Sequence, residues 1–552
     1  MPTLRPAILF DQRVPMRDTV TLSADVYLPS EAQDGGQVPA VLMRTPYVKS
    51  QEAQLEVGRA FARAGYAYVA MDVRGRGDSD GVFVPYFNDG LDGYDAIEWL
   101  ATQAWCDGKV GTIGASYPGR IQWLTAVLQP LHLAAMISIV TPSDPFVETP
   151  TGLPGPQHLC WLHYTSGRVN QPMESVEWAQ VYDHLPLLTM DERTGREIPR
   201  WREDVRHARL DDYWQAICYQ DKFAQVRVPV FHISGWYDDE QIGTPLNFLG
   251  MTTQGPTSEV RAAQRLLMGP WGHRVNTTSK LGEVDFGPQS LIDLRGEQIR
   301  FFDTHLRGNA DDRPPARIFV MGENVWRDEH EWPLARTEWL RFYLRSEGSA
   351  NSRYGDGWLS VELPFGDHLP SGYTYDPARP VPFITEATSS QIGGPDDYAA
   401  VQRRDDVLVY VTEALGQPLE VTGPVTVELY VSSSAPDTDF TAMLFDVHPS
   451  GFAQRLCDGM VRMRFRDGFE EPSLIEREKV YKITIECWNT SHVFQHRHAI
   501  GVQIASSAFP KFDRNLNTGE ELGTTTGMLA AEQQVFADEE HPSCVILPLI
   551  PR

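Results

Sequence analysis

The strongest chemical signal in the chain is residues 114–119, which have the sequence GASYPG. The segment follows an apolar run at 109–115 that is typical of a buried strand, and it precedes a helical stretch at 120–129. A serine at a tight turn from strand to helix forms a nucleophile elbow, which presents its hydroxyl at the edge of a sheet. The amide of Tyr117 would then lie at a helix N-terminus and could donate to an oxyanion. A serine that only caps a helix is the common alternative, but this context favours Ser116 as a nucleophile.

A serine nucleophile needs a histidine base and a carboxylate that orients it, here in the chain order serine, acid, histidine. The strand-like run 228–234 is followed by GWYDDE, which offers Asp238 and its neighbour Asp239. The next run, 265–268, is followed by GPWGHR, which contains His273. Of 15 histidines, His273 alone follows a late buried strand in a Gly/Pro-rich loop. We therefore predict His273 as the base. As the acid that orients it we prefer Asp238 to its neighbour Asp239.

Two further loops follow early strands. The loop RTPY at 44–47 lies where such enzymes place their second oxyanion donor, so the hydroxyl of Tyr47 is a candidate, although most tyrosines simply pack. The loop DVRGRGDSDG at 72–81 lacks the Gly-Lys-Ser/Thr of a phosphate loop and is interpreted as structural. The chain has no HExxH motif or clustered Cys/His spacing, so we expect no metal and no organic cofactor.

Between residues 14 and 333, strand-like stretches alternate with helix-like ones, and these elements must position the residues described above. Near-continuous apolar runs are typical of strands buried on both faces of a parallel sheet; they occur at 39–44, 66–72, 109–115, 133–140, 228–234, 265–268 and 317–321. Amphipathic stretches at 55–64 and 94–102 are typical of helices. The alternation predicts an α/β fold.

Two departures from this alternation divide the chain. Residues 145–225 are rich in proline and aromatic residues, contain helical spacing such as 174–188, and have no buried strand, so we expect an inserted helical cap. After 336 strands dominate, and a β-sandwich or jelly roll is predicted; the expected strands are 339–344, 358–363, 425–432, 441–447, 460–465, 480–488 and 500–506. The predicted parts are 1–144 and 226–335 for the α/β core, 145–225 for the cap and 336–552 for the β domain.

Composition excludes several classes of protein. The chain has 552 residues, which favours about three domains. With 48 basic and 74 acidic residues its net charge is −26, which makes binding to nucleic acid or to a membrane surface improbable. We find no run of about 18 apolar residues and no apolar leader at the N-terminus. The six cysteines have no CxxC spacing, which indicates reduced thiols and a cytoplasmic protein; assembly into a homo-oligomer stays open.

Together these motifs resemble the cocaine esterase-like CocE/NonD hydrolases, relatives of the X-Pro dipeptidyl-peptidases and the α-amino acid ester hydrolases. The resemblance rests on RTPY, the 72–81 loop, GASYPG, GWYD and GPWGH in that order, and on SAPDTDFTAMLFDV and SSAFPKFDRN in the late part of the chain. It covers nearly the whole chain. It implies an α/β-hydrolase core with a helical cap and a jelly-roll domain.

Residue by residue, the resemblance implies Ser116 as nucleophile, Asp238 and His273 as its triad partners, and Tyr47 as oxyanion donor together with the Tyr117 amide. It also accounts for Pro118, because members of the family carry Ser-Tyr-x-Gly. The expected function is hydrolysis of an ester or amide of a small molecule or short peptide through an acyl-enzyme. The aromatic cap residues Trp161 and Tyr164 are expected to form an apolar substrate pocket.

The substrate does not follow as directly. In the amino-ester hydrolases a Glu and an Asp, two and three residues after the triad acid, help to hold a substrate ammonium; here these positions are Glu240 and Gln241, so the set is incomplete. Glu240 could bind a cation, or it could be a solvated carboxylate. A peptidase or amino-ester hydrolase that requires a free ammonium therefore remains an alternative. A non-catalytic binding protein, with a carbohydrate-binding jelly roll, is a second one, against which the intact Ser-Asp-His set speaks.

Overall fold

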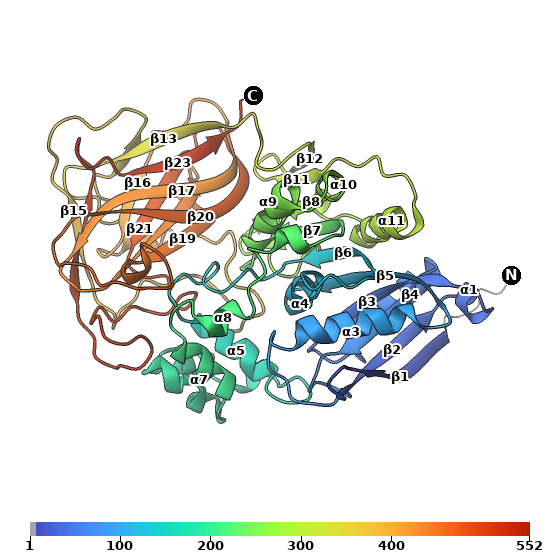
Figure 1. Ribbon diagram of the computed structural model, residues 1–552. Coiled ribbons are helices and arrows are strands. Elements are labelled where there is room, and N and C mark those ends of the chain that lie inside the picture. Colours follow the sequence, from blue (N-terminus) through green and yellow to red (C-terminus); the bar gives the residue numbers. More distant parts are fainter. Residues whose placement is uncertain (1–6, 552) are drawn as a thin grey trace.

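A ten-stranded mixed sheet organises the N-terminal part of the protein, for which a computed structural model describes residues 7–551 (Figure 1). The strand order is β1-β2-β4-β3-β5-β6-β7-β8-β11-β12, and the seven strands from β4 to β11 in this order run parallel. The strands are β1 (Ala7–Pro15), β2 (Thr21–Leu28), β3 (Val38–Thr45), β4 (Ala67–Asp72), β5 (Cys106–Ala115), β6 (Leu133–Ile139), β7 (Val230–Gly235), β8 (Arg265–Gly269), β11 (Ala316–Val320) and β12 (Val325–Glu329). Parallel strands aligned in this way bring the loops after β3, β5, β7 and β8 to one edge of the sheet.

Helices cover both faces of this sheet, which explains why its central parallel strands are largely apolar. In β3, Leu42 packs on one face with Ile97 and Trp123, whereas Val41 packs on the other face with Phe61. The helices of the first face are α3 (Asp89–Ala101), α4 (Tyr117–Ala126) and α9 (Gly243–Gln254), and those of the second are α2 (Glu52–Arg63) and α11 (Leu294–Arg307). Two short helices, α1 (Ser30–Gln33) and α10 (Ser258–Ala262), complete this part, with a small hairpin of β9 (Lys280–Leu281) and β10 (Val284–Asp285).

The chain between β6 and β7 contains helices and no assigned strand. They are α5 (Pro156–Tyr164), α6 (Trp178–Tyr182), α7 (Pro199–Arg206) and α8 (Asp212–Gln215), with 3-10 turns at Met173–Ser175, Leu187–Thr194 and Phe223–Gln225. The expectation of one helical stretch over 174–188 is wrong, because this segment contains α6 flanked by separate turns. Pro186 precedes the second turn, and a proline disfavours helical backbone at the residue before it. Trp178 and Trp201 are buried in a core of this segment's own.

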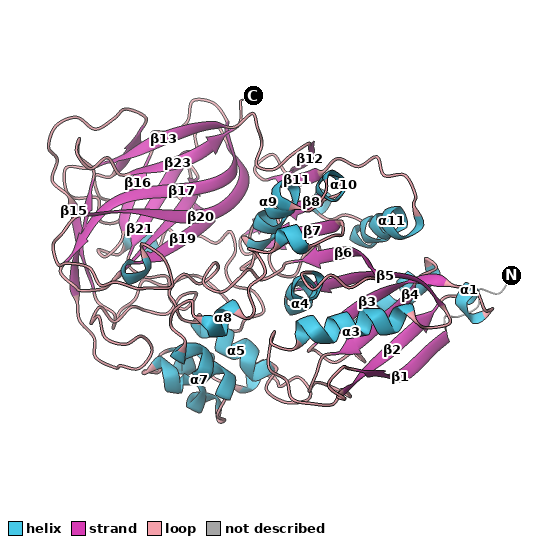
Figure 2. Cartoon of the chain, in the orientation of Figure 1, coloured by secondary structure: helices cyan, strands magenta, loops and turns pink. Residues whose placement is uncertain are grey.

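The C-terminal part is a β-sandwich of eleven strands (Figure 2). Its strands are β13 (Glu338–Arg345), β14 (Trp358–Ser360), β15 (Ser371–Tyr375), β16 (Leu408–Val411), β17 (Leu419–Ser433), β18 (Asp439–Val447), β19 (Ala453–Arg462), β20 (Tyr481–Phe494), β21 (Ala499–Ala505), β22 (Ala531–Phe536) and β23 (Cys544–Leu549). Two expected strands are corrected: 358–363 is regular only over its first three residues, and 460–465 ends in a 3-10 turn at Met463–Phe465. The expected strands omitted β15, β16, β22 and β23.

Both other parts contact the β domain. The cap does so through Gln157, which donates to the carbonyl of Glu386 at 2.9 Å, and Tyr182, which donates to that of Ala387 at 2.8 Å. The core does so at Met321, whose backbone N–H donates to the carbonyl of Ser491 and whose carbonyl accepts the N–H of Val493, both at 2.9 Å. Figure 1 shows α5 and α8 near the junction of the three parts. No helix within residues 7–551 is long and apolar enough to cross a membrane.

Candidate active site

Ser116 lies at a sharp turn between β5 and α4. Its φ of 63° is in the left-handed region, which is uncommon for a residue other than glycine and costs about 1–3 kcal/mol. The turn needs small neighbours: a Cβ on Gly114 would lie 2.3 Å from the carbonyl oxygen of Pro118, and one on Gly119 would lie 2.4 Å from Thr141 Oγ1. The local sequence thus holds the serine in the strained geometry of an elbow.

Asp238 and His273 come from the loops after β7 and β8, the next two neighbouring strands after β6. The carboxylate Oδ1 of Asp238 lies 2.8 Å from His273 Nδ1, and its Oδ2 accepts a hydrogen bond of 2.7 Å from Ser234 Oγ. Asp239 Oδ1 is farther from the same ring nitrogen, at 3.4 Å. Asp238 is 3% exposed, and these two contacts occupy both oxygens of its buried carboxylate. Of the two adjacent acids, Asp238 therefore has the geometry of the residue that orients the imidazole.

The acids around His273 favour its protonated form. Burial lowers the pKa of the imidazole, but the nearby carboxylates of Asp239, Glu240 and Asp238 outweigh burial and raise that pKa well above its usual value. An imidazole with such neighbours is stabilised when it takes up a proton, as a general base must during attack by serine.

Gln391, in the linker before β16, connects the two loops that carry Asp238 and His273. Its Oε1 accepts the backbone N–H of His273 at 2.9 Å, and its Nε2 donates to the carbonyl of Tyr237 at 3.2 Å. A Cβ on Gly272 would lie 2.1 Å from the same Oε1, so a side chain at this position would displace the Gln391 amide. Sequence reasoning missed Gln391, since it lies more than a hundred residues beyond His273 in a segment without a recognisable motif.

The hydroxyl of Tyr47 is held at the same site. Trp161 Nε1 donates to Tyr47 Oη at 2.9 Å, which leaves the tyrosine's own proton free to be donated elsewhere. Burial raises the pKa of Tyr47 far above neutrality, while hydrogen bonds with Trp161 and Ser116 partly oppose that rise. The phenol is therefore a neutral donor beside the serine. Its loop is fixed by buried Arg76, which donates to the carbonyl of Pro46 at 2.6 Å.

Arg76 belongs to the 72–81 loop, which the structure shows in a supporting position. The Asp72 carboxylate accepts the backbone N–H of Lys49 at 2.6 Å and that of Asp78 at 3.0 Å. Asn170 of the cap donates to the carbonyl of Tyr47 at 3.0 Å. The loop thus contributes to the site by fixing Tyr47.

A cavity of ≈ 150 Å³ contains Ser116 and His273 in its wall. Trp161 and Glu240 also line it, whereas Tyr164, whose ring centroid lies 5.8 Å from that of Tyr47, is not among the lining residues. Sequence reasoning missed several wall residues because they come from the cap and the β domain. The full lining is Tyr86, Ser116, Tyr117, Glu148, Thr149, Gly155, Gln157, His158, Trp161, Asp239, Glu240, His273, Ser389, Ile392 and Lys511.

Three carboxylates, those of Glu148, Asp239 and Glu240, line this cavity together. Burial raises the pKa of Glu148 to about 8 and that of Asp239 to about 6, and it raises that of Glu240 well above its usual value. Glu240 Oε2 is buried and has no hydrogen-bond partner. Lys511 also lines the cavity, but its ammonium is paired with Asp458 at 2.5 Å. The wall therefore offers acceptors suited to a positively charged group.

Gln241 occupies the second of the two positions at which the amino-ester hydrolases carry acids that help to hold a substrate ammonium. It does not line this cavity. Its side chain is buried and donates to the carbonyl of Asn489 in β20 at 2.6 Å. The third carboxylate comes instead from Glu148, which precedes α5 in the chain and whose Oε1 accepts the N–H of Ser143 at 2.5 Å.

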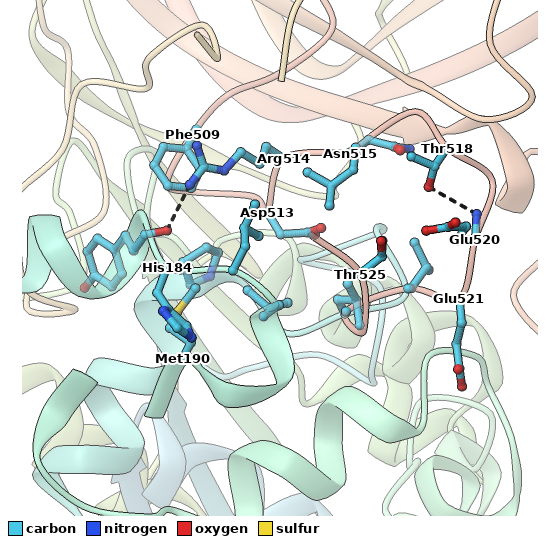
Figure 3. Close-up of a pocket in the computed structure, with 18 of the residues that line it drawn as sticks. His184, Met190, Phe509, Asp513, Arg514, Asn515, Thr518, Glu520, Glu521 and Thr525 are labelled. Carbon is cyan, nitrogen blue, oxygen red and sulfur yellow. Dashed lines mark hydrogen bonds between the residues drawn. The ribbon is translucent and has the colours of Figure 1, made fainter. Parts of the chain in front are cut away.

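Another cavity lies where the cap meets the β domain (Figure 3). It measures ≈ 40 Å³ and shares no lining residue with the cavity around Ser116. Arg514 donates to the carbonyl of Tyr182 across it at 3.5 Å, and Glu520 donates its backbone N–H to Thr518 Oγ1 at 3.3 Å (Figure 3). We interpret it as a packing gap at the junction between the two parts.

Two groups of side chains within residues 7–551 have donor atoms spaced closely enough for a metal ion. One is Asp238, Asp239 and His273, for which the hydrogen bond between Asp238 and His273 already gives a use. The other, in the β domain, consists of Asp446, His448 and His498. None of the six cysteines belongs to either group; all six are unpaired and five are buried.

This chain is similar to known proteins over nearly its whole length. The family model for the X-Pro dipeptidyl-peptidase (S15 family) matches residues 18–275, and that for the X-Pro dipeptidyl-peptidase C-terminal non-catalytic domain matches residues 308–546. Cocaine esterase of Rhodococcus sp. (strain MB1 Bresler) is 38% identical over 575 residues, which cover 98% of each chain. A putative serine esterase of Mycobacterium tuberculosis is 26% identical and covers 90% of this chain and 89% of its own.

Solved structures agree over the full length. An α-amino acid ester hydrolase superimposes with a TM-score of 0.86 at 25% identity, covering 99% of this chain and 97% of its own. An aminopeptidase from a marine-sediment Thaumarchaeota archaeon gives a TM-score of 0.87 at 25% identity, with coverage of 100% and 97%. The expected α/β-hydrolase core with a C-terminal β-sandwich is confirmed, and the protein is a serine hydrolase of the ester- or peptide-cleaving type. The chain belongs to the family of CocE/NonD-like serine hydrolases.

Proposed function

We propose that the protein cleaves ester or amide bonds of small molecules with Ser116 as nucleophile, His273 as general base and Asp238 as the acid that orients it. The observation that supports this proposal most strongly is the hydrogen bond of 2.8 Å between Asp238 and His273. The ring of His273 lines the same cavity as the strained Ser116.

In the proposed reaction Ser116 Oγ attacks the substrate carbonyl carbon while His273 takes up the hydroxyl proton. The new C–O bond places negative charge on the carbonyl oxygen, which accepts hydrogen bonds from the Tyr47 hydroxyl and the Tyr117 amide. The tetrahedral intermediate then expels the alcohol or amine, which receives the proton from His273. Water, deprotonated by His273, attacks the acyl-enzyme; the acyl–Oγ bond then breaks, the acid leaves, and His273 returns the proton to Ser116 Oγ.

Labelling with a fluorophosphonate tests this proposal directly. The probe should modify the wild-type protein and the Ser389→Ala variant, whose serine lines the same cavity without an elbow, but not Ser116→Ala. Ester turnover should be lost in the same pattern, with each variant shown to be folded by circular dichroism. Undiminished labelling or turnover in folded Ser116→Ala would identify another nucleophile.

A second candidate concerns the substrate: an ester or amide whose acyl part carries a free ammonium group. The observation that favours it is the group of Glu148, Asp239 and Glu240 in the cavity wall, with one oxygen of Glu240 buried and unpaired. Uncompensated burial raises the pKa of each acid, and an ammonium among them would reverse this effect. Relatives named X-Pro dipeptidyl-peptidase, aminopeptidase and α-amino acid ester hydrolase agree with such a substrate.

This candidate is tested by comparing an aminoacyl aryl ester with its N-acetylated form. Glu240→Gln should raise KM for the free amine by roughly 10- to 100-fold, the range expected for a hydrogen bond to a charged group, and leave the acetylated ester almost unchanged. Glu174→Gln, an exposed glutamate of the cap, is the matched control. Equal effects of Glu240→Gln on both esters would rule out ammonium recognition and leave the hydrolase mechanism intact.

The proposal also includes a cytoplasmic location. Its support is that all six cysteines are unpaired, as is usual for proteins kept in a reducing compartment. Fractionation of the native host cells, followed by detection of the protein in each fraction, tests it.

A further inference from the structure

Three histidines surround one buried carboxylate, that of Asp446, far from GASYPG in the sequence. Asp446 lies near the end of β18, His448 lies in the turn that follows, and His492 belongs to β20. His498 immediately precedes β21, which pairs with β18 so that Asp446 lies opposite Ile500. The sheet thus brings together a set that neither its spacing nor a motif reveals.

The donor atoms of this set converge on Asp446. His498 Nδ1 lies 2.8 and 2.9 Å from the two carboxylate oxygens, and His448 Nε2 lies 3.6 Å from one of them. The two imidazole rings are 4.3 Å apart between centroids. One donor atom from each of these three residues lies within 4.8 Å of the other two, as atoms bound to a common ion do.

The burial of Asp446 and the partial solvent exposure of the two histidines are also suited to binding an ion. Asp446 is 1% exposed, whereas the side chains of His448 and His498 are 28% and 16% exposed and leave a route from solvent. His492 is buried, and its Nε2 lies 2.8 Å from the Asp446 carboxylate. A buried histidine in this position can hold and orient a ligating carboxylate, a role that partners of metal ligands commonly have.

We propose that Asp446, His448 and His498 bind a divalent transition-metal ion of the zinc class, with His492 holding the carboxylate in place. Two imidazoles and one carboxylate are donors that zinc and its neighbours in the first transition row accept, and three protein ligands leave a further position for water. Gln454 Oε1, 3.2 Å from His448 Nε2, is an oxygen donor close enough to serve as a fourth ligand.

The site has a structural connection to the hydrolase core. Gln454 Nε2 donates to the hydroxyl of Tyr237 at 3.3 Å, and Tyr237 directly precedes Asp238 in the chain. The ion would therefore stabilise the turn between β18 and β19 and, through Gln454, the packing of the β domain against the loop of Asp238. It takes no part in the hydrolytic steps. This inference does not depend on which residue is the nucleophile.

Zinc binding to the metal-free full-length protein tests the proposal by competition with a chromophoric chelator. We expect one equivalent to bind to the wild type and affinity to fall at least tenfold in His448→Phe and in His498→Gln. His492→Phe should weaken binding about 10- to 100-fold, the usual effect of losing such a partner. His541→Gln, a histidine paired with Asp538 elsewhere in the β domain, is the control and should bind as the wild type does.

The acids beside His273 are a competing explanation for any bound zinc, so Asp239→Asn is included. Retained binding in Asp239→Asn, together with loss in folded His448→Phe, supports the proposal. It is overturned if the wild type binds no zinc at micromolar concentrations, if the double variant His448→Phe/His498→Gln binds as well as the wild type, or if only Asp239→Asn loses binding. In each of those cases the histidines form a hydrogen-bonded cluster around Asp446 without an ion.

Discussion

Replacing Tyr47 by phenylalanine removes one hydroxyl and keeps the ring in its place against Tyr164. The proposed oxyanion site has two donors, the Tyr47 hydroxyl and the Tyr117 amide. Because Trp161 Nε1 already occupies an acceptor position of Tyr47 Oη at 2.9 Å, the phenolic proton is available to the substrate oxygen. Because burial raises the pKa of Tyr47 far above neutrality, the group stays a donor over the working pH range.

Loss of one such donor costs about 100- to 1000-fold in kcat, or about 2.7–4 kcal/mol of transition-state stabilisation. KM should change little, since the ground-state carbonyl gains less from the donor than the oxyanion does. The variant also leaves the Trp161 N–H without its partner in a partly buried site, which should lower the free energy of unfolding by about 1 kcal/mol. The expected loss of transition-state stabilisation is therefore larger than the expected loss in the free energy of unfolding.

The assay is steady-state hydrolysis of an aryl ester, with urea denaturation to measure stability. A double-mutant cycle with Trp161→Phe sharpens it. If Trp161 acts by orienting the Tyr47 hydroxyl, Trp161→Phe lowers kcat in the wild-type background and has little further effect in Tyr47→Phe. A kcat for Tyr47→Phe within threefold of wild type would refute the oxyanion role, and equal losses from Trp161→Phe in both backgrounds would make Trp161 part of the pocket wall only.

Other predictions concern the residues around the imidazole. Asp238→Asn should lower kcat/KM by about 10⁴, as in serine proteases that lose the correct histidine tautomer, and Asp239→Asn should lower it far less; the opposite order would exchange their roles. Because the Asp239 carboxylate raises the pKa of His273, Asp239→Asn should lower that pKa and move the acid limb of the kcat/KM profile to lower pH, whereas an unmoved limb would show that Asp239 does not act on the base. Gln391→Ala should lower kcat roughly 10- to 100-fold with KM nearly unchanged, because the loop that carries His273 loses its hydrogen bonds to Gln391. A wild-type kcat would show that this loop keeps its position without Gln391. Gly272→Ala should reproduce this loss in kcat by displacing the Gln391 amide.

Much of the fold was predictable because burial and periodicity are local signals. β3 and the second half of β5 are largely apolar, since helices cover both faces of their sheet, and alternation in β17 and β20 marks a sandwich with one wet face. The segment 174–188 was predicted wrongly because helical spacing alone does not show where a helix begins and ends; within this segment α6 covers only Trp178–Tyr182. Short strands such as β14 and β16 owe their regularity to partners far along the chain.

The positions of Ser116 and His273 followed from the sequence by itself, because each lies directly after a recognisable strand and parallel strands deliver such loops to one edge. The sequence also specified the strained turn at Ser116, through glycines where no Cβ fits. Only the tertiary structure decided that Asp238 rather than Asp239 faces the imidazole at hydrogen-bonding distance, since adjacent side chains differ in direction by an amount that depends on how the loop packs.

The same holds for groups that come from other parts of the chain. Glu148, Gln391 and Lys511 reach the site from the cap and the β domain, and Asp446 meets His498 through strand pairing in the sandwich. No local signature shows where these side chains meet, because the environment of each consists of residues tens to hundreds of positions away. Residue type and spacing determine the chemistry that a loop can perform, whereas the packing of three parts against one another determines which charges surround it and therefore which pKa values and substrates the site supports.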